Sequence, residues 1–227
     1  MSAGPEGPGG PSRLPARLAA RLDALLAPGG RVLLGIAGTP GSGKSTLAEA
    51  VVDHVDAARE RAAWVPMDGF HLADCELDRL GRRARKGAID TFDARGYLAL
   101  LHRTVAETTA TVYAPAFDRA LEQPLAGSIP VLPQARLVVT EGNYLLDAAE
   151  PWPDVRRVLT EVWYCDVAAD ERRRRLVGRH VRFGKSPEAA DAWVTTVDEP
   201  NARRVDAGRG LADLVVDSSD LMTRKVY

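Results

Sequence analysis

Apolar residues near the start of the chain recur at the spacing of one face of an α-helix. They are Leu14, Leu18, Leu22, Leu25 and Leu26. Pro28-Gly29-Gly30 follows them and predicts the end of this helix. The next segment, 31–37, is a continuous apolar run of strand length. Because its apolar residues do not alternate with polar ones, we expect a strand covered on both faces, as in a parallel sheet.

Strand-like and helix-like segments continue to alternate along the chain. The patterns predict further strands at 62–67, 111–117, 136–140, 159–164 and 214–217. They predict further helices at 44–55, 72–80, 97–108, 168–182 and 187–205. Residues 81–96 are basic and irregular, and the prolines of 118–135 predict a long surface loop. Strands separated by helices favour an α/β fold, with a parallel sheet of about five strands and helices on both faces.

Composition limits the classes of protein to which the chain can belong. Its 227 residues are 45% hydrophobic, which is enough for one domain with a sizeable core. The Gly- and Pro-rich residues 1–11 predict a disordered tail, which leaves 12–227 as a single domain. A net charge of −1 argues against a general nucleic-acid binder. With two cysteines, no apolar run of bilayer length and no signal-peptide pattern, we expect a cytoplasmic protein without a membrane partner.

One segment carries a complete phosphate-binding motif. Residues 38–45 match G-x-x-x-x-G-K-[ST], after an apolar strand and at the start of a helix, which is the context that supports the motif. Its glycines let backbone N–H groups turn inward around an anion at a helix N-terminus. The lysine can reach the β- and γ-phosphates, and the serine hydroxyl can bind Mg²⁺. The predicted nucleoside triphosphate site comprises Gly38, Thr39, Pro40, Gly41, Ser42, Gly43, Lys44, Ser45 and Thr46.

A dinucleotide-binding loop does not fit this segment, because its fingerprint would need a small third residue at Thr46 and leaves Lys44 unexplained. The motif alone leaves open whether the γ-phosphate passes to water or to a substrate.

Ligands of open parallel sheets lie beyond the carboxyl ends of the strands. Asp68 follows the strand at 62–67 and could accept a proton from a substrate hydroxyl, or could cap the next helix. Glu141 follows the strand at 136–140 and could hold Mg²⁺ directly or through water.

Several strings, taken in their order and spacing, carry a family resemblance. They are MDGFH at 67–71, RKGAIDTFDARGY at 85–97, VYAPAFDR at 112–119, TEGNYLL at 140–146, WYCD at 163–166 and RRRRLVGRH at 172–180. From about Arg31 onward the chain resembles the uridine kinase, pantothenate kinase and phosphoribulokinase superfamily of P-loop kinases, and within it the bacterial nucleoside/nucleotide kinase or fructokinase-like branch. The resemblance implies a three-layer P-loop NTPase fold, an acceptor-binding insert at about 70–135 and a small lid at about 168–187.

The resemblance also implies roles for single residues. Asp68 stands where the superfamily has its catalytic Asp, and Glu141 matches a Glu that serves the metal and the substrate side. Residues that match positions lining or near the acceptor are Arg85, Lys86, Tyr113, Arg119 and Asn201. His71 is a further candidate for contact with the acceptor, although a lone His at this place is as often a packing residue. Uridine kinases have Ser and Tyr where this chain has Gly69 and His71, so the acceptor stays open among nucleosides, sugars and pantothenate-like alcohols.

The stretch at 171–185 is rich in arginine, with seven Lys or Arg residues and one Glu. Such a run predicts a solvated helix face, a nonspecific polyanion patch, or a lid that closes over the transferring phosphoryl group. Fixed guanidinium groups there would stabilise the charge that develops on the γ-oxygens, and closure would exclude water. We favour the lid, with Arg175 and Arg179 as its catalytic residues beside Lys44 of the loop.

Together these observations predict an ATP-dependent kinase that phosphorylates a hydroxyl of a small-molecule alcohol. Mg²⁺ would be held by Ser45 and Glu141. The alternative is a nucleotide-driven ATPase or switch without an acceptor, and the lack of an N-K-x-D signature disfavours a GTPase of that kind. We expect no nucleic-acid partner, and a homodimer is consistent with relatives that form dimers or tetramers.

Overall fold

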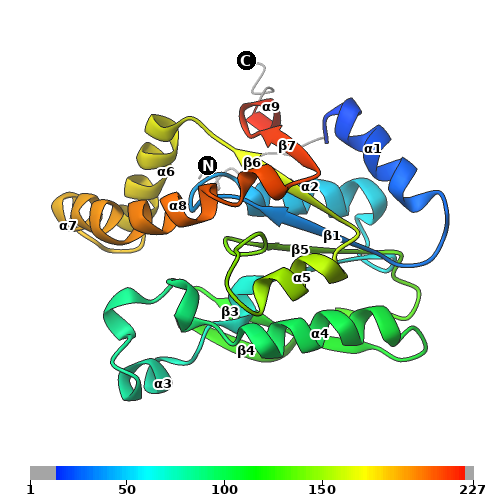
Figure 1. Ribbon diagram of the computed structural model, residues 1–227, viewed down its shortest axis with the longest axis horizontal. Helices are drawn as coiled ribbons and strands as arrows, with labels where there is room; N and C mark the ends of the chain where they lie inside the picture. The colour runs from blue at the N-terminus through cyan, green and yellow to red at the C-terminus, as the bar shows by residue number, and fades with distance from the viewer. Residues whose placement is uncertain (1–13, 223–227) are drawn as a thin grey trace, which may run out of the picture.

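The computed structural model describes residues 14–222, so the tail predicted at 1–11 lies outside the described residues. Figure 1 shows the arrangement of the elements. The strands are β1 (Val32–Ala37), β2 (Ala62–Pro66), β3 (Val112–Asp118), β4 (Gln123–Val131), β5 (Leu137–Gly142), β6 (Glu161–Asp166) and β7 (Leu214–Asp217). The helices are α1 (Ala16–Leu26), α2 (Lys44–Asp56), α3 (Asp74–Arg79), α4 (Ala94–Ala106), α5 (Trp152–Val158), α6 (Ala169–Arg182), α7 (Pro187–Trp193), α8 (Glu199–Asp206) and α9 (Ser219–Met222).

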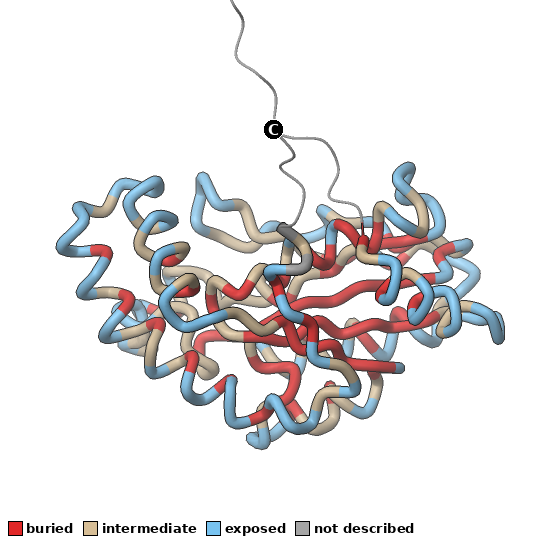
Figure 2. The backbone as a smooth tube through the Cα atoms, turned by 90° about the horizontal axis from the view of Figure 1, so that it is seen from above, coloured by how far each residue is buried: buried red, intermediate tan, exposed pale blue. Residues whose placement is uncertain are grey.

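Five strands form a parallel sheet in the order β2-β5-β1-β6-β7, which confirms the predicted sheet. Every residue of β1 and β5 is buried, as expected for unalternated apolar strands. Because successive side chains point to opposite faces, Leu33 and Leu34 pack into two different cores. Helices α1 and α2 cover one face, while α4, α5 and the β3–β4 pair cover the other. The strands form the buried middle layer in Figure 2.

The prediction of a surface loop at 118–135 is wrong over much of that segment. Residues 123–131 form β4, which pairs antiparallel with β3 in a separate two-stranded sheet. The register shifts between Ala114 and Ala116, at Pro115. Two prolines, Pro124 and Pro130, lie within β4, and a strand with a free edge tolerates proline because that edge needs no ladder donor. The strand predicted at 111–117 therefore exists as β3 but lies outside the main sheet.

The helix predicted at 187–205 is continuous but changes its winding. Residues of α7 and α8 are joined by a π-helical segment, Val194–Asp198. Pro200 follows this segment and lacks the backbone N–H that an α-helical turn would use. A wider turn before a proline is one way for a helix to absorb that loss. The segment matters for function because it contributes to the wall of the main cleft.

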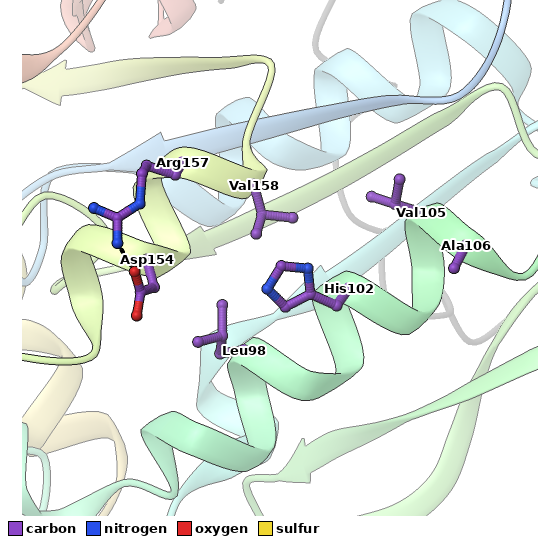
Figure 3. Close-up of a pocket in the computed structure, with 7 residues that line it drawn as sticks. All are labelled: Leu98, His102, Val105, Ala106, Asp154, Arg157 and Val158. Atoms are coloured by element: carbon purple, nitrogen blue, oxygen red, sulfur yellow. Dashed lines mark ion pairs between the residues drawn. The ribbon is translucent and has the colours of Figure 1, made fainter.

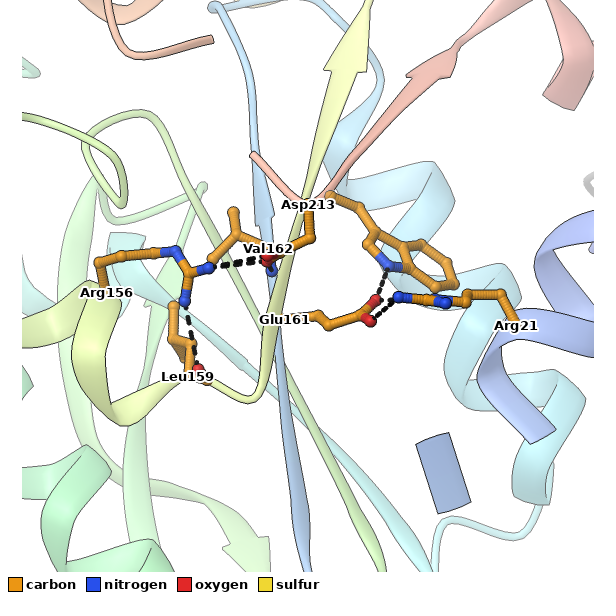
Figure 4. Close-up of polar contacts among 7 residues, drawn as sticks. Arg21, Arg156, Leu159, Glu161, Val162 and Asp213 are labelled. Atoms are coloured by element: carbon orange, nitrogen blue, oxygen red, sulfur yellow. Dashed lines mark hydrogen bonds and ion pairs between the residues drawn. The ribbon is translucent and has the colours of Figure 1, made fainter. Parts of the chain in front are cut away.

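Polar contacts fix the start of β6 against the neighbouring elements, as Figure 4 shows. Glu161 is buried and accepts hydrogen bonds from Trp163 Nε1 at 2.9 Å and from the guanidinium of Arg21 on α1. Asp213 accepts from the backbone N–H of Val162 at 2.7 Å and from Arg156 at 2.8 Å. These contacts hold α1 and α5 to the sheet. None of the helices within 14–222 combines the length and apolarity needed to span a bilayer.

Candidate active site

The phosphate-binding motif forms the turn between β1 and α2. Gly43 precedes the first residue of α2, and its φ of +99° is in the left-handed region. The Lys44 side chain folds back over this turn, and its Nζ donates to the carbonyl of Thr39 at 3.0 Å. Burial lowers the pKa of the Lys44 ammonium, while the charge of Glu141 acts in the opposite direction. The loop therefore presents backbone N–H groups and a buried amine at a helix N-terminus, which is an anion-binding arrangement.

Asp68 and Glu141 lie at the carboxyl ends of two neighbouring strands. In the β2–β5 register Pro66 pairs with Glu141, and Asp68 lies in the short 3₁₀ helix that follows β2. Glu141 is 6% exposed, and the Ser45 hydroxyl donates to its Oε1 at 3.1 Å. Burial raises the pKa of Glu141 to about 7, with a further contribution from the negative charge of Asp68. The charge of Lys44, the hydrogen bond from Ser45 and the charge of Arg119 lower the pKa of Glu141 and so oppose that rise.

Close packing fixes the two acids relative to one another. A Cβ on Gly142 would lie 2.6 Å from Met67 Sδ, and a Cβ on Gly69 would lie 2.3 Å from the carbonyl oxygen of Pro115. Only glycine fits at these two places, because real Cβ atoms do not approach so closely. Thr140 adds a buried link, since its hydroxyl donates to the carbonyl of Val65 at 2.6 Å. The ends of β2 and β5 are therefore joined just before Asp68 and Glu141.

Ser45 and Glu141 also provide a donor set that suits Mg²⁺. A hydroxyl and a carboxylate are hard oxygen ligands, which this ion prefers. Within residues 14–222, no group of three or more His, Cys, Asp or Glu side chains could hold a metal ion without other ligands. In phosphoryl-transfer sites Mg²⁺ is generally bound by one or two carboxylates together with substrate phosphates.

His71 extends the site beyond Asp68. Its Nδ1 lies 2.8 Å from the carbonyl oxygen of Asp68, so Nδ1 carries the proton and donates. Burial lowers the pKa of the His71 imidazole, which favours the neutral ring with an unprotonated Nε2. The ring packs against Phe92 at 4.0 Å and Phe117 at 4.9 Å between ring centroids. His71 is thus held in one orientation as a hydrogen-bond acceptor on the wall of the cleft.

The lid predicted at about 168–187 comprises α6 and the turn that leads to the first residue of α7. Arg175 Nε donates to Glu171 at 2.7 Å, and Arg175 Nη1 donates to the Ser218 hydroxyl at 3.3 Å. Arg179 lines the same cleft, and its guanidinium forms no ion pair or hydrogen bond within the described part of the chain. His180 lies 2.8 Å from the buried Asp198 of the π-helical segment. These contacts tie α6 to the segment that faces it.

One cleft of about 730 Å³ brings most of the predicted residues together. Predicted residues that line it are Pro40, Gly41, Gly43, Lys44, Ser45, Thr46, Asp68, His71, Lys86, Arg119, Glu141, Arg175, Arg179 and Asn201. Gly38, Thr39 and Ser42 belong to the loop but do not line the cleft. The cleft is also lined by residues that were not predicted from the sequence, among them Arg83, Phe92, Phe117, Glu122, Phe183, Lys185, Trp193 and Val197.

Two residues predicted to contact the acceptor lie outside this cleft. The Arg85 guanidinium pairs with both carboxylate oxygens of Asp90, at 2.7 and 2.6 Å, and does not line the cleft. Tyr113 is 58% exposed and lies near the start of β3. The cleft reaches β3 only at its other end, at Phe117, about 13 Å further along a strand that rises about 3.3 Å per residue. The wall of the cleft is formed by Lys86, which was predicted together with Arg85, and by Phe117, which was not predicted.

A second cavity of about 770 Å³ lies between α4 and α5 and is shown in Figure 3. Its lining is mostly apolar, with His102 and the Asp154–Arg157 ion pair as its titratable groups. It shares no residue with the cleft at the phosphate-binding loop. Because it lacks convergent polar groups, the candidate active site is the cleft of the loop.

Comparison with known proteins finds relatives that match most of the chain. The chain is 36% identical over 203 residues to a Schizosaccharomyces pombe protein provisionally named as a uridine kinase, an alignment covering 86% of each protein. It is 31% identical to the Escherichia coli protein YggC, over 84% of this chain and 79% of that protein. A crystal structure of a Silicibacter protein, provisionally named as a fructose transport system kinase, superposes with a TM-score of 0.79. It is 37% identical and covers 88% of this chain and 98% of its own. No protein-family model matches the chain.

Proposed function

The chain belongs to the uridine kinase type of P-loop kinases, and from that premise we propose that it transfers the γ-phosphoryl group of ATP to a hydroxyl of a small-molecule alcohol. The acceptor classes are a nucleoside, a sugar or a pantothenate-like alcohol. One observation carries the proposal: Asp68, a carboxylate able to accept a proton, lines the same cleft as Lys44 and Ser45 of the phosphate-binding loop.

In this proposal the loop binds the ATP phosphates through its backbone N–H groups and Lys44. Ser45 and Glu141 would hold Mg²⁺, which when bound neutralises charge on the β- and γ-phosphates. Lys44 and Glu141 line the cleft together with the phosphate-binding loop, so both side chains lie where the phosphates enter. The γ-phosphate is thereby directed toward the part of the cleft lined by Asp68.

Asp68 would accept the proton of the attacking hydroxyl as the alcohol oxygen approaches the γ-phosphorus in line with the leaving oxygen. The unprotonated Nε2 of His71 would accept a hydrogen bond from a second polar hydrogen of the acceptor. Both side chains belong to one turn, because His71 Nδ1 donates to the carbonyl of Asp68. An acceptor held by His71 is therefore positioned relative to the base.

Arg175 and Arg179 would stabilise the charge that spreads over the γ-oxygens in the transition state. Arg175 is oriented by Glu171 and Ser218, whereas Arg179 has no partner within residues 14–222 and is free to meet a phosphate. Closure of α6–α8 over the cleft would also exclude water, which competes with the alcohol as acceptor.

An ADP-release screen tests the proposal against an ATPase without an acceptor. The panel comprises nucleosides, ketoses, aldoses, glycerate and pantothenate, with water as the reference. Release that rises at least tenfold with one alcohol, together with detection of its phosphate ester, supports a kinase. Equal release with and without every alcohol would support hydrolysis and refute the proposal. Relatives with kinase names favour the first outcome. A homodimer, a cytoplasmic location and the lack of a nucleic-acid partner stay predictions from the sequence.

A further inference from the structure

One side of the cleft carries positive charge that the phosphate-binding loop and the lid do not supply. We call it the acceptor wall and define it as Arg83, Lys86, Phe117, Arg119 and Glu122, all of which line the cleft. Arg83 and Lys86 come from the connection between α3 and α4, Phe117 from the end of β3, and Arg119 and Glu122 from the turn between β3 and β4. In Figure 1 these elements lie on one side of the molecule, and α6–α8 lie on the other.

Ion pairing within the acceptor wall is uneven. The two oxygens of Asp74 are shared between Lys86 at 2.7 Å and Arg83 at 2.8 Å, so one carboxylate serves two cations. Asp78 adds a longer contact of 3.5 Å to Arg83 and is largely exposed. Arg119 lines the cleft that holds Asp68 and has no ion pair or hydrogen bond within the described residues, and its positive charge acts on Glu141, whose pKa it lowers.

Lys86 connects the two segments of the acceptor wall and has one N–H donor that forms no hydrogen bond within the described part of the chain. Its Nζ is bonded to Asp74 and to the carbonyl of Glu122, and it lies 5.3 Å from the centre of the Phe117 ring. An ammonium has three N–H groups, so these two bonds leave one. The bond to Glu122 fixes the hairpin turn that bears Arg119. The side chain of Lys86 is only 14% exposed, and it still lines the cleft.

We propose that the alcohol acceptor carries an anionic group, a phosphate or a carboxylate, that is bound by Arg119 with Lys86 as a second donor. The inference rests on the proposed function, because it names the substrate class of that site. In the proposed function Lys44, Arg175 and Arg179 serve the triphosphate. Arg119 remains as a planar guanidinium on the acceptor wall that forms no hydrogen bond or ion pair within residues 14–222. A guanidinium matches the geometry of a carboxylate or phosphate and binds it through two parallel hydrogen bonds. The negative charge of Glu122, which also lines the cleft, would repel such an anion, so replacement of Glu122 by Gln should strengthen anion binding.

A binding experiment tests the anion site without phosphoryl transfer. The protein is loaded with Mg²⁺ and a non-hydrolysable ATP analogue, and its unfolding temperature is followed as inorganic phosphate or acetate is added. We expect a saturable rise in the wild type, about a 10- to 100-fold weaker response in Arg119→Gln, and a stronger response in Glu122→Gln. Arg95→Gln, an exposed arginine outside the cleft, serves as the control and should behave as wild type. An unsaturable response, or equal responses in the wild type and Arg119→Gln, would overturn the proposal.

Turnover with matched acceptors then separates this inference from the proposed function. Glycerol is compared with glycerate, fructose with fructose 6-phosphate, and uridine with uridine monophosphate. We expect kcat/KM at least tenfold higher for the anionic member of one pair, and loss of that preference in Arg119→Gln with the KM for ATP unchanged. Turnover that favours the neutral members refutes the anionic acceptor and leaves the kinase standing. Turnover of no alcohol refutes the kinase, and the phosphate titration still decides the anion site.

Discussion

Replacement of Asp68 by Asn tests the mechanism most directly, because the change removes a base and little else. Among residues 14–222 the Asp68 carboxylate makes no hydrogen bond or ion pair that Asn would break. Its negative charge attracts Lys44, repels Glu141 and raises the pKa of the His71 imidazole. These effects oppose one another, so we expect the free energy of unfolding to change by no more than about 0.5 kcal/mol. Affinity for ATP should be retained.

The rate of phosphoryl transfer should fall strongly in Asp68→Asn, because general base catalysis contributes about 10²- to 10⁴-fold to the rate. At about 1.36 kcal/mol for each tenfold change, Asp68→Asn should raise the barrier by about 2.7–5.4 kcal/mol. The assay measures ADP release with the alcohol of highest turnover, ATP affinity by calorimetry and stability by thermal unfolding. Glu141→Gln is the matched comparison, since it should require more Mg²⁺ for half-maximal rate, whereas Asp68→Asn should not. Turnover of Asp68→Asn within tenfold of wild type would show that another group takes the proton.

Three further variants and the pH dependence of stability test single residues. Gly142→Ala places a methyl group within 2.7 Å of Met67 Cβ and should destabilise the protein by about 1–3 kcal/mol in thermal unfolding. Arg31→Gln should lower the free energy of unfolding in urea by about 2–4 kcal/mol. The Arg31 guanidinium donates to the carbonyls of Thr104, Glu107, Leu132, Pro133 and Ala135. The pKa of Glu141 is raised from 4.5 to about 7 in the folded, nucleotide-free protein, so the folded state binds the extra proton between these values. The stability of wild type relative to Glu141→Gln should therefore fall as pH rises from 4.5 to 7, and a flat difference would contradict this. Arg179→Ala should lower kcat more than ATP affinity, and an effect on affinity alone would remove Arg179 from the transition state.

Much of the sheet and the nucleotide half of the site could be predicted from the sequence. Strands β1 and β5 are unbroken apolar runs, and burial on both faces of a sheet requires that pattern. Asp68 and Glu141 follow such strands, so the geometry of parallel sheets brings them to one edge. Strand β4 escaped prediction because its prolines indicate a loop in sequence, and only the structure reveals that it has a free edge. Helix α5 was missed because it is short and begins beside two prolines.

The difference between the two halves of the cleft has a physical cause. A triphosphate is bound mainly by the backbone of one contiguous turn. The conformation of that turn requires glycines at fixed spacing, followed by Lys44 and Ser45, so the motif can be recognised in the sequence. The acceptor wall instead combines side chains from two distant segments that share no local pattern. Arg85 and Lys86 are neighbours in sequence but differ in position: Arg85 pairs with Asp90 outside the cleft, whereas Lys86 lines the cleft. Adjacency in sequence therefore does not predict which side chain of this segment reaches the cleft. Because the acceptor wall and the loop share no residue, substitution of Arg119 should change the KM for the acceptor without changing that for ATP.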